Sequence, residues 1–383
     1  MILDCLNPNL PSPVVGLLGI HGDLLYLSLL FAGNCLLRKE EQIRIFGHFA
    51  LIPIIVASGI SIYQHAVDPY FLNRKVLEVP ELRTIYMRPI PGFSENMIMA
   101  PSLFVDPGRY ARYALFVFWF SLTIAPLIGV WSLIYITAAI LGMITAGPRF
   151  APVITVSALL LIMSLRFFSW IKEGVQGTRI KRIASRFAIG GLLAIGISTF
   201  ILYLALPNVI ERSTLWFKNT LIGSEERPSD ISIRIPGYLR AFRSFWVLEG
   251  GIFGLGTGSN SLGGQYLEKF LKIRTHFITE GSEQGFRRYL LMYGLLGFII
   301  RFLLFLVILR VIWNSSEAFN EERGKWVVKI WFCFLISYLT LAQLLGAAHM
   351  QDYMAQSFLW LVSGLVISLP KVYGNEKTEI EIS

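Results

Sequence analysis

The sequence has little charge, few cysteines and none of several familiar catalytic motifs. Charged side chains make up 15% of the 383 residues, whereas soluble domains carry roughly a quarter. Three cysteines occur without paired spacing, so we expect neither a disulfide framework nor a metal cluster. The aspartates are far apart and form no Asp-x-Asp motif, and the chain has no Walker sequence and no His-Glu-x-x-His. The sequence therefore disfavours a soluble-type glycosyltransferase that depends on a metal and a nucleotide sugar.

Apolar residues dominate instead, with 54% of the chain hydrophobic and 14% aromatic. Several apolar runs reach about 20 residues, the length that crosses a hydrocarbon core as a helix. These runs are too long and too uniformly apolar for barrel strands, and backbone groups in lipid must bond to one another. The sequence therefore predicts an all-α polytopic membrane protein. Because the first basic residue is Arg38, we expect no ordinary signal peptide.

The apolar runs predict about nine transmembrane helices in one integral membrane domain, residues 1–383, without internal repeats. The 113–145 run is too long for one span, and Pro126 and Gly129 divide it, so we expect a tight hairpin of two spans there. Together with this hairpin, the predicted spans are residues 14–37, 45–63, 150–165, 187–206, 289–313, 330–345 and 353–369.

The links between the predicted spans indicate the orientation of the chain. The 166–186 link has six basic residues and one acidic residue, which is typical of a cytoplasmic loop. Alternation then places the links 38–44 and 317–329 in the cytoplasm, and segments 65–112 and 207–288 on the outer side. The net charge of +9 lies largely in such connections, so it does not indicate nucleic-acid binding. Segment 65–112 contains Arg109 and Arg112, which line either an anionic site or a solvated loop.

The long, partly helical outer segment 207–288, before the seventh predicted span, carries the residues best suited to chemistry. Arg234, Arg240 and Arg243 can clamp phosphate groups. The alternative is an interfacial helix, because Tyr238, Phe242 and Trp246 recur every four residues and the arginines could contact lipid phosphates.

Glycines follow this basic stretch. Gly254, Gly256 and Gly258 lie in a run that lets the backbone approach an anion closely, or that forms a flexible turn. No strand pattern typical of a dinucleotide site precedes them.

A polar stretch joins the glycines to the next span. His276 is the only histidine of the segment and can take a proton from a hydroxyl near neutral pH, or is a solvated loop residue. Glu280 and Glu283 are alternative bases. Arg287 and Arg288 come next, and we expect them to bind substrate at the outer end of the span.

Four parts of this region resemble the O-antigen ligase and O-antigen polymerase superfamily. They are Arg234 followed by Tyr238, the Phe253-Gly254-Leu255-Gly256 stretch, the loop residue His276, and Gly294-Leu295-Leu296-Gly297 at the start of a span. The strong part of the resemblance covers about 65 residues. Two positions differ from the usual pattern of the family, since Tyr238 replaces a Trp and Tyr293 replaces a Glu.

The resemblance implies a function on the outer, periplasmic side of the bacterial inner (plasma) membrane. The donor would be an undecaprenyl-pyrophosphate-linked glycan, and the acceptor another lipid-linked unit or a glycan, without metal or cofactor. Arg234 would hold the donor pyrophosphate, and His276 would act on the acceptor hydroxyl or the leaving group. Chain-length or export proteins of polysaccharide assembly are the partners this implies, besides the membrane lipids.

Two other readings remain open from the sequence. A flippase for lipid-linked oligosaccharides would carry charged residues deep in several spans and two related halves, and neither pattern is visible. A non-catalytic membrane subunit of a polysaccharide assembly system is the second alternative, because Tyr293 departs from the family pattern.

Overall fold

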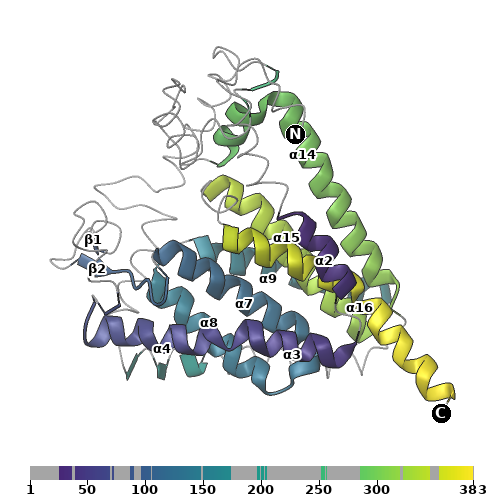
Figure 1. Ribbon diagram of the computed structural model, residues 1–383, viewed down its shortest axis with the longest axis horizontal. Helices are drawn as coiled ribbons and strands as arrows, with labels where there is room; N and C mark the ends of the chain where they lie inside the picture. Colours follow the sequence, from purple (N-terminus) through teal and green to yellow (C-terminus); the bar gives the residue numbers. More distant parts are fainter. Residues whose placement is uncertain are drawn as a thin grey trace.

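In the computed structural model the described chain is a bundle of helices with one small two-stranded hairpin (Figure 1). The described residues are 26–36, 39–69, 71–72, 87–89, 96–104, 106–147, 150–173, 196–198, 200–201, 203–204, 252–254, 256, 285–319, 322–345 and 353–382. The hairpin pairs β1 (Met87–Pro89) with β2 (Asn96–Ile98) in antiparallel fashion.

The described part of the chain forms a bundle of nine helices. They are α2 (Ser28–Leu36), α3 (Glu40–Leu51), α4 (Pro53–Ala66), α7 (Pro107–Ile128), α8 (Trp131–Ala146), α9 (Phe150–Glu173), α14 (Gly285–Glu317), α15 (Glu322–Leu345) and α16 (Tyr353–Ile382). Pro53 at the start of α4 separates it from α3, because proline cannot donate a helical hydrogen bond.

Several of these helices are long and apolar enough to cross a membrane, so the protein is a multi-pass membrane protein. Among the described residues six helical stretches meet this criterion, and the nine spans that the sequence predicts are not confirmed. The six are Glu40–Ala66, Pro107–Ile128, Phe150–Phe167, Met292–Glu317, Gly324–Leu341 and Ala355–Val372. Helix α8 is apolar but shorter, and most of the predicted spans 14–37 and 187–206 lies outside the described residues.

The hairpin predicted within residues 113–145 is present as α7 and α8. Helix α7 ends at Ile128, and Gly129 adopts a positive φ of 59° that favours glycine. The first helix begins at Pro107, six residues earlier than predicted, because Asp106 caps it by accepting a 2.8 Å hydrogen bond from the Gly108 amide. Arg112 is therefore helical and not part of a solvated loop.

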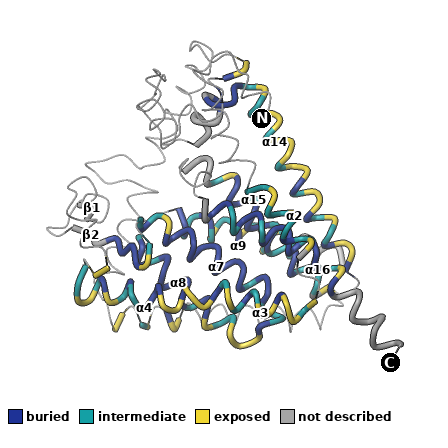
Figure 2. Tube along the Cα trace, in the orientation of Figure 1, coloured by how far each residue is buried: buried dark blue, intermediate teal, exposed yellow. Residues whose placement is uncertain are grey.

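Helix α7 is the central element of the bundle. It contacts α3, α4, α8, α9, α15 and α16. In its most apolar stretch 78% of the residues are buried, against 11% in the corresponding stretch of α14. Figure 2 shows the same contrast, with α7 almost entirely buried and α14 exposed along one side. The exposed apolar side of α14 is what a lipid-facing helix presents.

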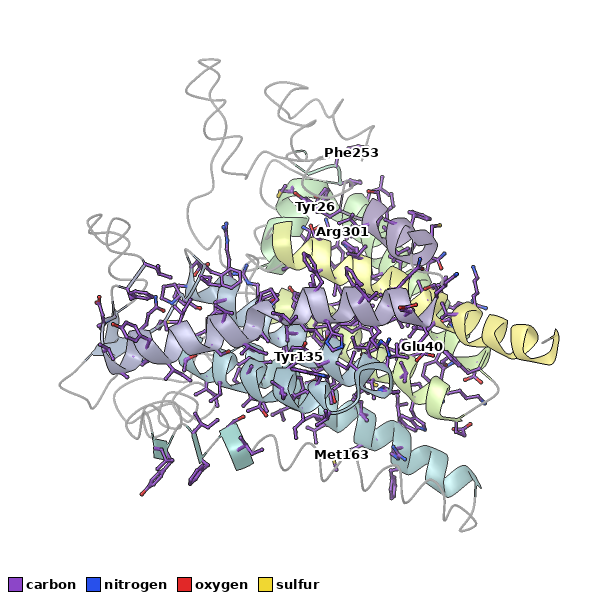
Figure 3. All side chains as sticks on the ribbon, turned by 60° about the horizontal axis from the view of Figure 1, so that its bottom comes forward. Tyr26, Glu40, Tyr135, Met163, Phe253 and Arg301 are labelled. Atoms are coloured by element: carbon purple, nitrogen blue, oxygen red, sulfur yellow. The ribbon has the colours of Figure 1, made fainter. Side chains whose placement is uncertain are left out.

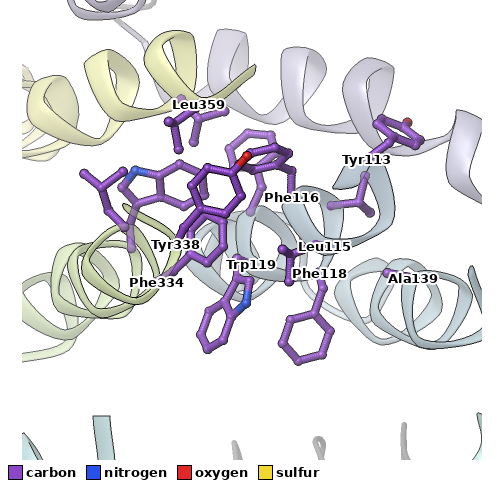
Figure 4. Packing of buried hydrophobic residues seen from close by; sticks show 14 of the residues in the cluster. Tyr113, Leu115, Phe116, Phe118, Trp119, Ala139, Phe334, Tyr338 and Leu359 are labelled. Atoms are coloured by element: carbon purple, nitrogen blue, oxygen red, sulfur yellow. The ribbon is translucent and has the colours of Figure 1, made fainter. Parts of the chain in front are cut away.

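Aromatic side chains from α7, α15 and α16 form the middle of the core (Figure 4). The rings of Trp119 and Phe334 stack with centroids 5.5 Å apart. Phe116 lies 5.1 Å from Tyr338 and 5.6 Å from Phe358, measured between ring centroids. Tyr113, near the start of α7, lies 6.5 Å from Phe358 between ring centroids. Because Phe358 is early in α16 and Tyr338 is late in α15, the start of α7 lies at the bundle end where α15 ends and α16 begins. We call this end of the bundle, where α7 and α16 begin and α15 ends, the glycine end.

The opposite end of the bundle carries tryptophan and basic side chains. The Arg166 guanidinium lies 4.8 Å from the centroid of Trp326, and the Lys329 ammonium lies 5.4 Å from Trp313 and 5.5 Å from Trp326. Such pairs are typical of a membrane–water interface. Late α14 and early α15 therefore meet at one membrane surface, and α14 begins at the glycine end.

Helices α2 and α16 pack with their backbones in contact at two glycines. A Cβ atom on Gly33 of α2 would overlap the carbonyl oxygen of Leu361, and one on Gly364 of α16 would overlap that of Leu30. Small residues allow this close packing of helices in a membrane, where dispersion contacts drive association.

Candidate active site at the start of α14

Helix α14 is interrupted at Gly294, two residues after the beginning of its membrane-spanning part. Gly294 has φ 63° and ψ −173°, a region that is essentially restricted to glycine. The short stretch 252–256 of the long outer segment lies against this interruption, and within it Gly254 and Gly256 also have positive φ values, 70° and 92°. In Figure 1 this stretch lies at the top of α14.

Two hydrogen bonds join the stretch to the helix, and they replace one bond of the helix itself. In a regular α-helix the amide of Leu296 would donate to the carbonyl of Met292. Here the Met292 carbonyl accepts from the Gly256 amide at 2.9 Å, and the Leu296 amide donates to the Ile252 carbonyl at 3.2 Å. The outer segment is thus connected to α14 by backbone bonds at the point where the helix opens.

The contact between the two backbones leaves no room for a side chain on either glycine. A Cβ atom on Gly254 would overlap the amide nitrogen of Gly294, and one on Gly294 would overlap the carbonyl oxygen of Ile252. Gly297, one turn later, makes room for the ring of Tyr293, since a Cβ there would lie 2.6 Å from that of Tyr293. We call residues 252–256 and 292–297 together the glycine junction.

The position of the glycine junction explains why such irregular backbone is tolerated near lipid. Backbone groups that leave a helix within a membrane need partners in the protein. Met292, Tyr293 and Gly294 are buried, and the two bonds to residues 252–256 supply those partners. The side chains of Ile252 and Phe253 stay exposed, and Figure 3 shows Phe253 at the same end of the molecule as Arg301.

A tyrosine and an arginine lie beside the glycine junction. The phenol oxygen of Tyr293 accepts a 3.3 Å hydrogen bond from Arg301 Nη1, and the guanidinium carbon lies 5.5 Å from the Tyr293 ring centroid. Arg301 is half-buried, whereas Tyr293 is 4% exposed. The guanidinium is also 5.6 Å from the ring of Phe305.

Only some of the predicted site residues lie within the described part of the chain. Gly254 and Gly256 lie in the glycine junction, and the Gly256 amide bonds to α14, so this amide is not a donor held open for an anion. Arg287 and Arg288 lie in the first turn of α14. The remaining predicted residues lie outside the described residues: Arg234, Arg240, Arg243, Gly258, His276, Glu280 and Glu283.

The sequence reading did not single out Arg301. The signal that could have found it is an arginine, one of two with Arg310, inside an otherwise apolar run and eight residues after Tyr293. An ionisable residue within a span is costly and often functional.

A second polar cluster lies at the glycine end, buried between α4, α7 and α8. The Tyr110 hydroxyl is 3.2 Å from both Ser58 Oγ and Ser61 Oγ. Ser58 Oγ also donates to the Ala138 carbonyl at 2.6 Å, and Ser61 Oγ is 2.9 Å from Thr145 Oγ1. Each of these hydroxyls therefore has a hydrogen-bond partner, and the cluster links α4, α7 and α8.

Hydrogen bonds also connect this cluster to the segment that precedes α7. The Ser102 amide donates to Gln64 Oε1 at 2.8 Å, and the Ala100 amide donates to the Thr145 carbonyl at 3.2 Å. That carbonyl also lies 2.8 Å from His65 Nε2. These bonds join the end of α4, the end of α8 and residues 100–102, so we interpret the cluster as structural.

The Tyr110→Phe change is expected to destabilise the protein only slightly, by about 0.5–1 kcal/mol, because single polar contacts between membrane helices are worth about that much. Ser58 and Ser61 both keep another partner in the variant. Thermal unfolding in detergent measures the effect, with Tyr63→Phe on the exposed side of α4 as the matched control. A loss of several kcal/mol would contradict this interpretation.

Comparison with known proteins adds no identification. No protein-family model matches the chain, and no curated protein sequence matches it significantly.

Proposed function

We propose that the protein polymerises or ligates glycan units that are linked to undecaprenyl pyrophosphate, in the assembly of a surface polysaccharide. The observation that carries the proposal is the glycine junction. Two stretches that resemble the O-antigen ligase and polymerase superfamily, Phe253–Gly256 and Gly294–Gly297, are about 40 residues apart in the sequence, and backbone bonds join them in the structure. This packing is expected if the function depends on both stretches being close together.

The glycine junction supports the proposal through its effect on the outer segment. Stretch 252–256 lies between the predicted phosphate clamp, Arg234 to Arg243, and the predicted acceptor residue His276. Attachment at the start of a membrane span keeps the middle of the segment close to the membrane surface, where the diphosphate of a lipid-linked donor lies. Fixed placement of reacting groups is a large part of catalysis in a transfer between two bound substrates.

In the proposed reaction a hydroxyl oxygen of the acceptor attacks the anomeric carbon of the donor glycan. The bond between that carbon and the pyrophosphate oxygen breaks, and undecaprenyl pyrophosphate leaves. The proton of the hydroxyl passes to a base, for which His276, Glu280 and Glu283 are the alternatives. Arg234, with Arg240 and Arg243, stabilises the charge that develops on the leaving pyrophosphate. No metal or redox cofactor takes part.

The first test is the loss of polymer in Arg234→Ala and His276→Ala variants. Each variant is expected to abolish polymer in cells while its abundance in the membrane stays normal, because each removes a group that acts in the transfer and not in the bundle. Gel separation of surface polysaccharide by length, with immunoblotting of membranes, measures both quantities.

Arg227→Ala is the matched control, since Arg227 lies in the same outer segment and in none of the stretches that carry the resemblance. Normal polymer length in the Arg234→Ala or the His276→Ala variant would remove that residue from the mechanism. If purified protein of the natural sequence transfers no glycan from an undecaprenyl-pyrophosphate-linked donor to any supplied acceptor, the proposed activity fails. Accumulation of undecorated lipid-linked units on the inner leaflet after gene deletion would favour the flippase instead.

A further inference from the structure

The end of the bundle opposite the glycine end brings two positive charges to one indole ring. The Trp326 ring of α15 has the Arg166 guanidinium of α9 4.8 Å from its centroid and the Lys329 ammonium 5.5 Å from it. Trp313 of α14 contacts the same ammonium, with its ring centroid 5.4 Å away. Two like charges at one ring repel each other, and an anion beside them would offset that cost. We call these four residues the basic cluster.

Lys329 lies inside a membrane span and not in the link that precedes it. It follows Gly324, the first residue of the span Gly324–Leu341, by five residues, which is about 8 Å along the helix. A basic residue in the link would be enough to orient the chain, whereas a cation inside a span is costly. Because helical side chains turn back toward the helix start, the ammonium reaches Trp326 and Trp313, and tryptophans are typical of the headgroup boundary.

The Lys329 ammonium has hydrogen-bond donors that the described chain does not use. It carries three N–H groups. Among the described residues it makes the two ring contacts, but no hydrogen bond and no ion pair. Glu322, the acidic residue at the start of α15, pairs instead with Lys325 at 3.3 Å. Since Arg166 has further contacts in the protein, the donors open to a ligand are those of Lys329.

The surroundings of the basic cluster indicate the class of ligand. The anions at this depth in a bilayer are lipid phosphates, and basic sites between membrane helices bind anionic headgroups. Helix α15 packs against both α14 and α9, and each of these two helices exposes apolar side chains, among them Val307, Val311 and Met163. Acyl chains can therefore lie along either helix while the headgroup contacts Lys329. A zwitterionic headgroup is a weaker ligand, because its own cation competes for the phosphate.

We propose that Lys329, held between Trp313 and Trp326, binds the phosphate of an anionic phospholipid such as phosphatidylglycerol. The basic 166–186 link begins at Arg166, and its charge predicts that this membrane surface is the cytoplasmic one. The lipid therefore belongs to the inner leaflet. This site lies at the end of the bundle opposite the glycine junction, and it does not depend on the proposed function.

The experiment measures lipid binding to the purified full chain in neutral detergent by native mass spectrometry. The probes are phosphatidylglycerol and, with the same acyl chains, phosphatidylcholine, which has a phosphate but no net charge. The natural protein is expected to bind phosphatidylglycerol more tightly. Lys329→Met is expected to weaken that binding about fivefold, which corresponds to about 1 kcal/mol for one basic residue at an anionic membrane surface.

The same change is expected to leave phosphatidylcholine binding nearly unaltered. Lys329→Arg keeps the charge and is expected to retain most of the phosphatidylglycerol binding. Methionine is compatible with an apolar span, and thermal unfolding checks that the variant is folded. If Lys329→Met fails to fold, Lys329→Gln decides in its place.

Lys325→Gln is the matched control. Lys325 lies one turn before Lys329 on the same helix, and its loss changes the net charge by the same amount, but its ammonium already pairs with Glu322. Its removal is expected to weaken phosphatidylglycerol binding by less than about twofold, because a paired surface charge contributes little. An equal loss in Lys325→Gln and Lys329→Met would mean that the net charge of the surface attracts the lipid, and would overturn the assignment to Lys329.

Two further results overturn the inference. One is unchanged phosphatidylglycerol binding in Lys329→Met, which would mean that water satisfies the ammonium. The other is equal binding of phosphatidylglycerol and phosphatidylcholine by the natural protein. Both can occur in a protein that transfers glycan. Conversely, phosphatidylglycerol binding that depends on Lys329, in a protein that transfers no glycan, supports the inference and refutes the proposed function.

Discussion

Replacing Gly294 by alanine is expected to reduce the proposed glycan transfer by about 100-fold. Alanine cannot adopt the backbone angles of Gly294 without strain of about 1–3 kcal/mol, and its Cβ atom would overlap the Ile252 carbonyl oxygen. The helix would relieve both by closing over the interruption, which restores the bond from Leu296 to Met292 and releases stretch 252–256. Displacement of positioned groups by about 1 Å can cost a factor of about 100.

Transfer from a purified lipid-linked donor measures this effect, together with membrane abundance and helical content. Gly254→Ala is expected to behave in the same way, since its Cβ would overlap the Gly294 amide nitrogen. Gly59→Ala is the matched control, because Gly59 is helical and its surroundings leave open space for a Cβ atom. Transfer that stays within a factor of two in both Gly254→Ala and Gly294→Ala would show that the glycine junction does not serve the reaction.

The second large effect is expected on stability, in the Gly364→Leu variant. The backbones of α2 and α16 touch at Gly364, so a leucine there has to push the two helices apart. Overpacking in a well-packed interior typically costs about 1–3 kcal/mol, and separation of two membrane helices also loses their dispersion contacts. We expect a markedly lower unfolding temperature in detergent and less protein in the membrane.

Gly33→Leu is expected to reproduce this loss from the other helix, because a Cβ on Gly33 would overlap the Leu361 carbonyl oxygen. Gly59→Leu introduces the same side chain into open space on α4, so it is expected to leave the unfolding temperature nearly unchanged. An unfolding temperature of Gly364→Leu that equals that of the natural protein would mean that α2 does not pack on α16 through its glycines.

The features that depend on local sequence were largely predictable. The turn between α7 and α8 follows from Gly129, and the apolar runs predict long helices because any sequence of that composition must bond internally in lipid. The early start of α7 was missed for a local reason as well. Asp106 and Pro107 are a helix-start signal, but they lie in a segment whose many prolines favoured a loop.

Features that depend on contacts between distant segments were harder to predict from the sequence. The resemblance singled out the stretches around Gly254 and Gly294, but nothing in the sequence states that the Gly256 amide bonds to the Met292 carbonyl. From the sequence the glycines were expected either to let the backbone approach an anion or to form a flexible turn, and Gly254 and Gly256 provide close contact between two backbones. Arg301 illustrates the same limit, since its partner Tyr293 is two helical turns away and only the fold shows that both face inward.

The packing of α2 on α16 has a consequence for how the protein is made. The ribosome delivers α2 to the membrane long before Gly364 has been translated, so the glycine surface of α2 spends most of synthesis without its native neighbour. The contact between Gly33 and Leu361 therefore forms only after α16 has been synthesised, so the packing of these two helices is a late step in the assembly of the bundle.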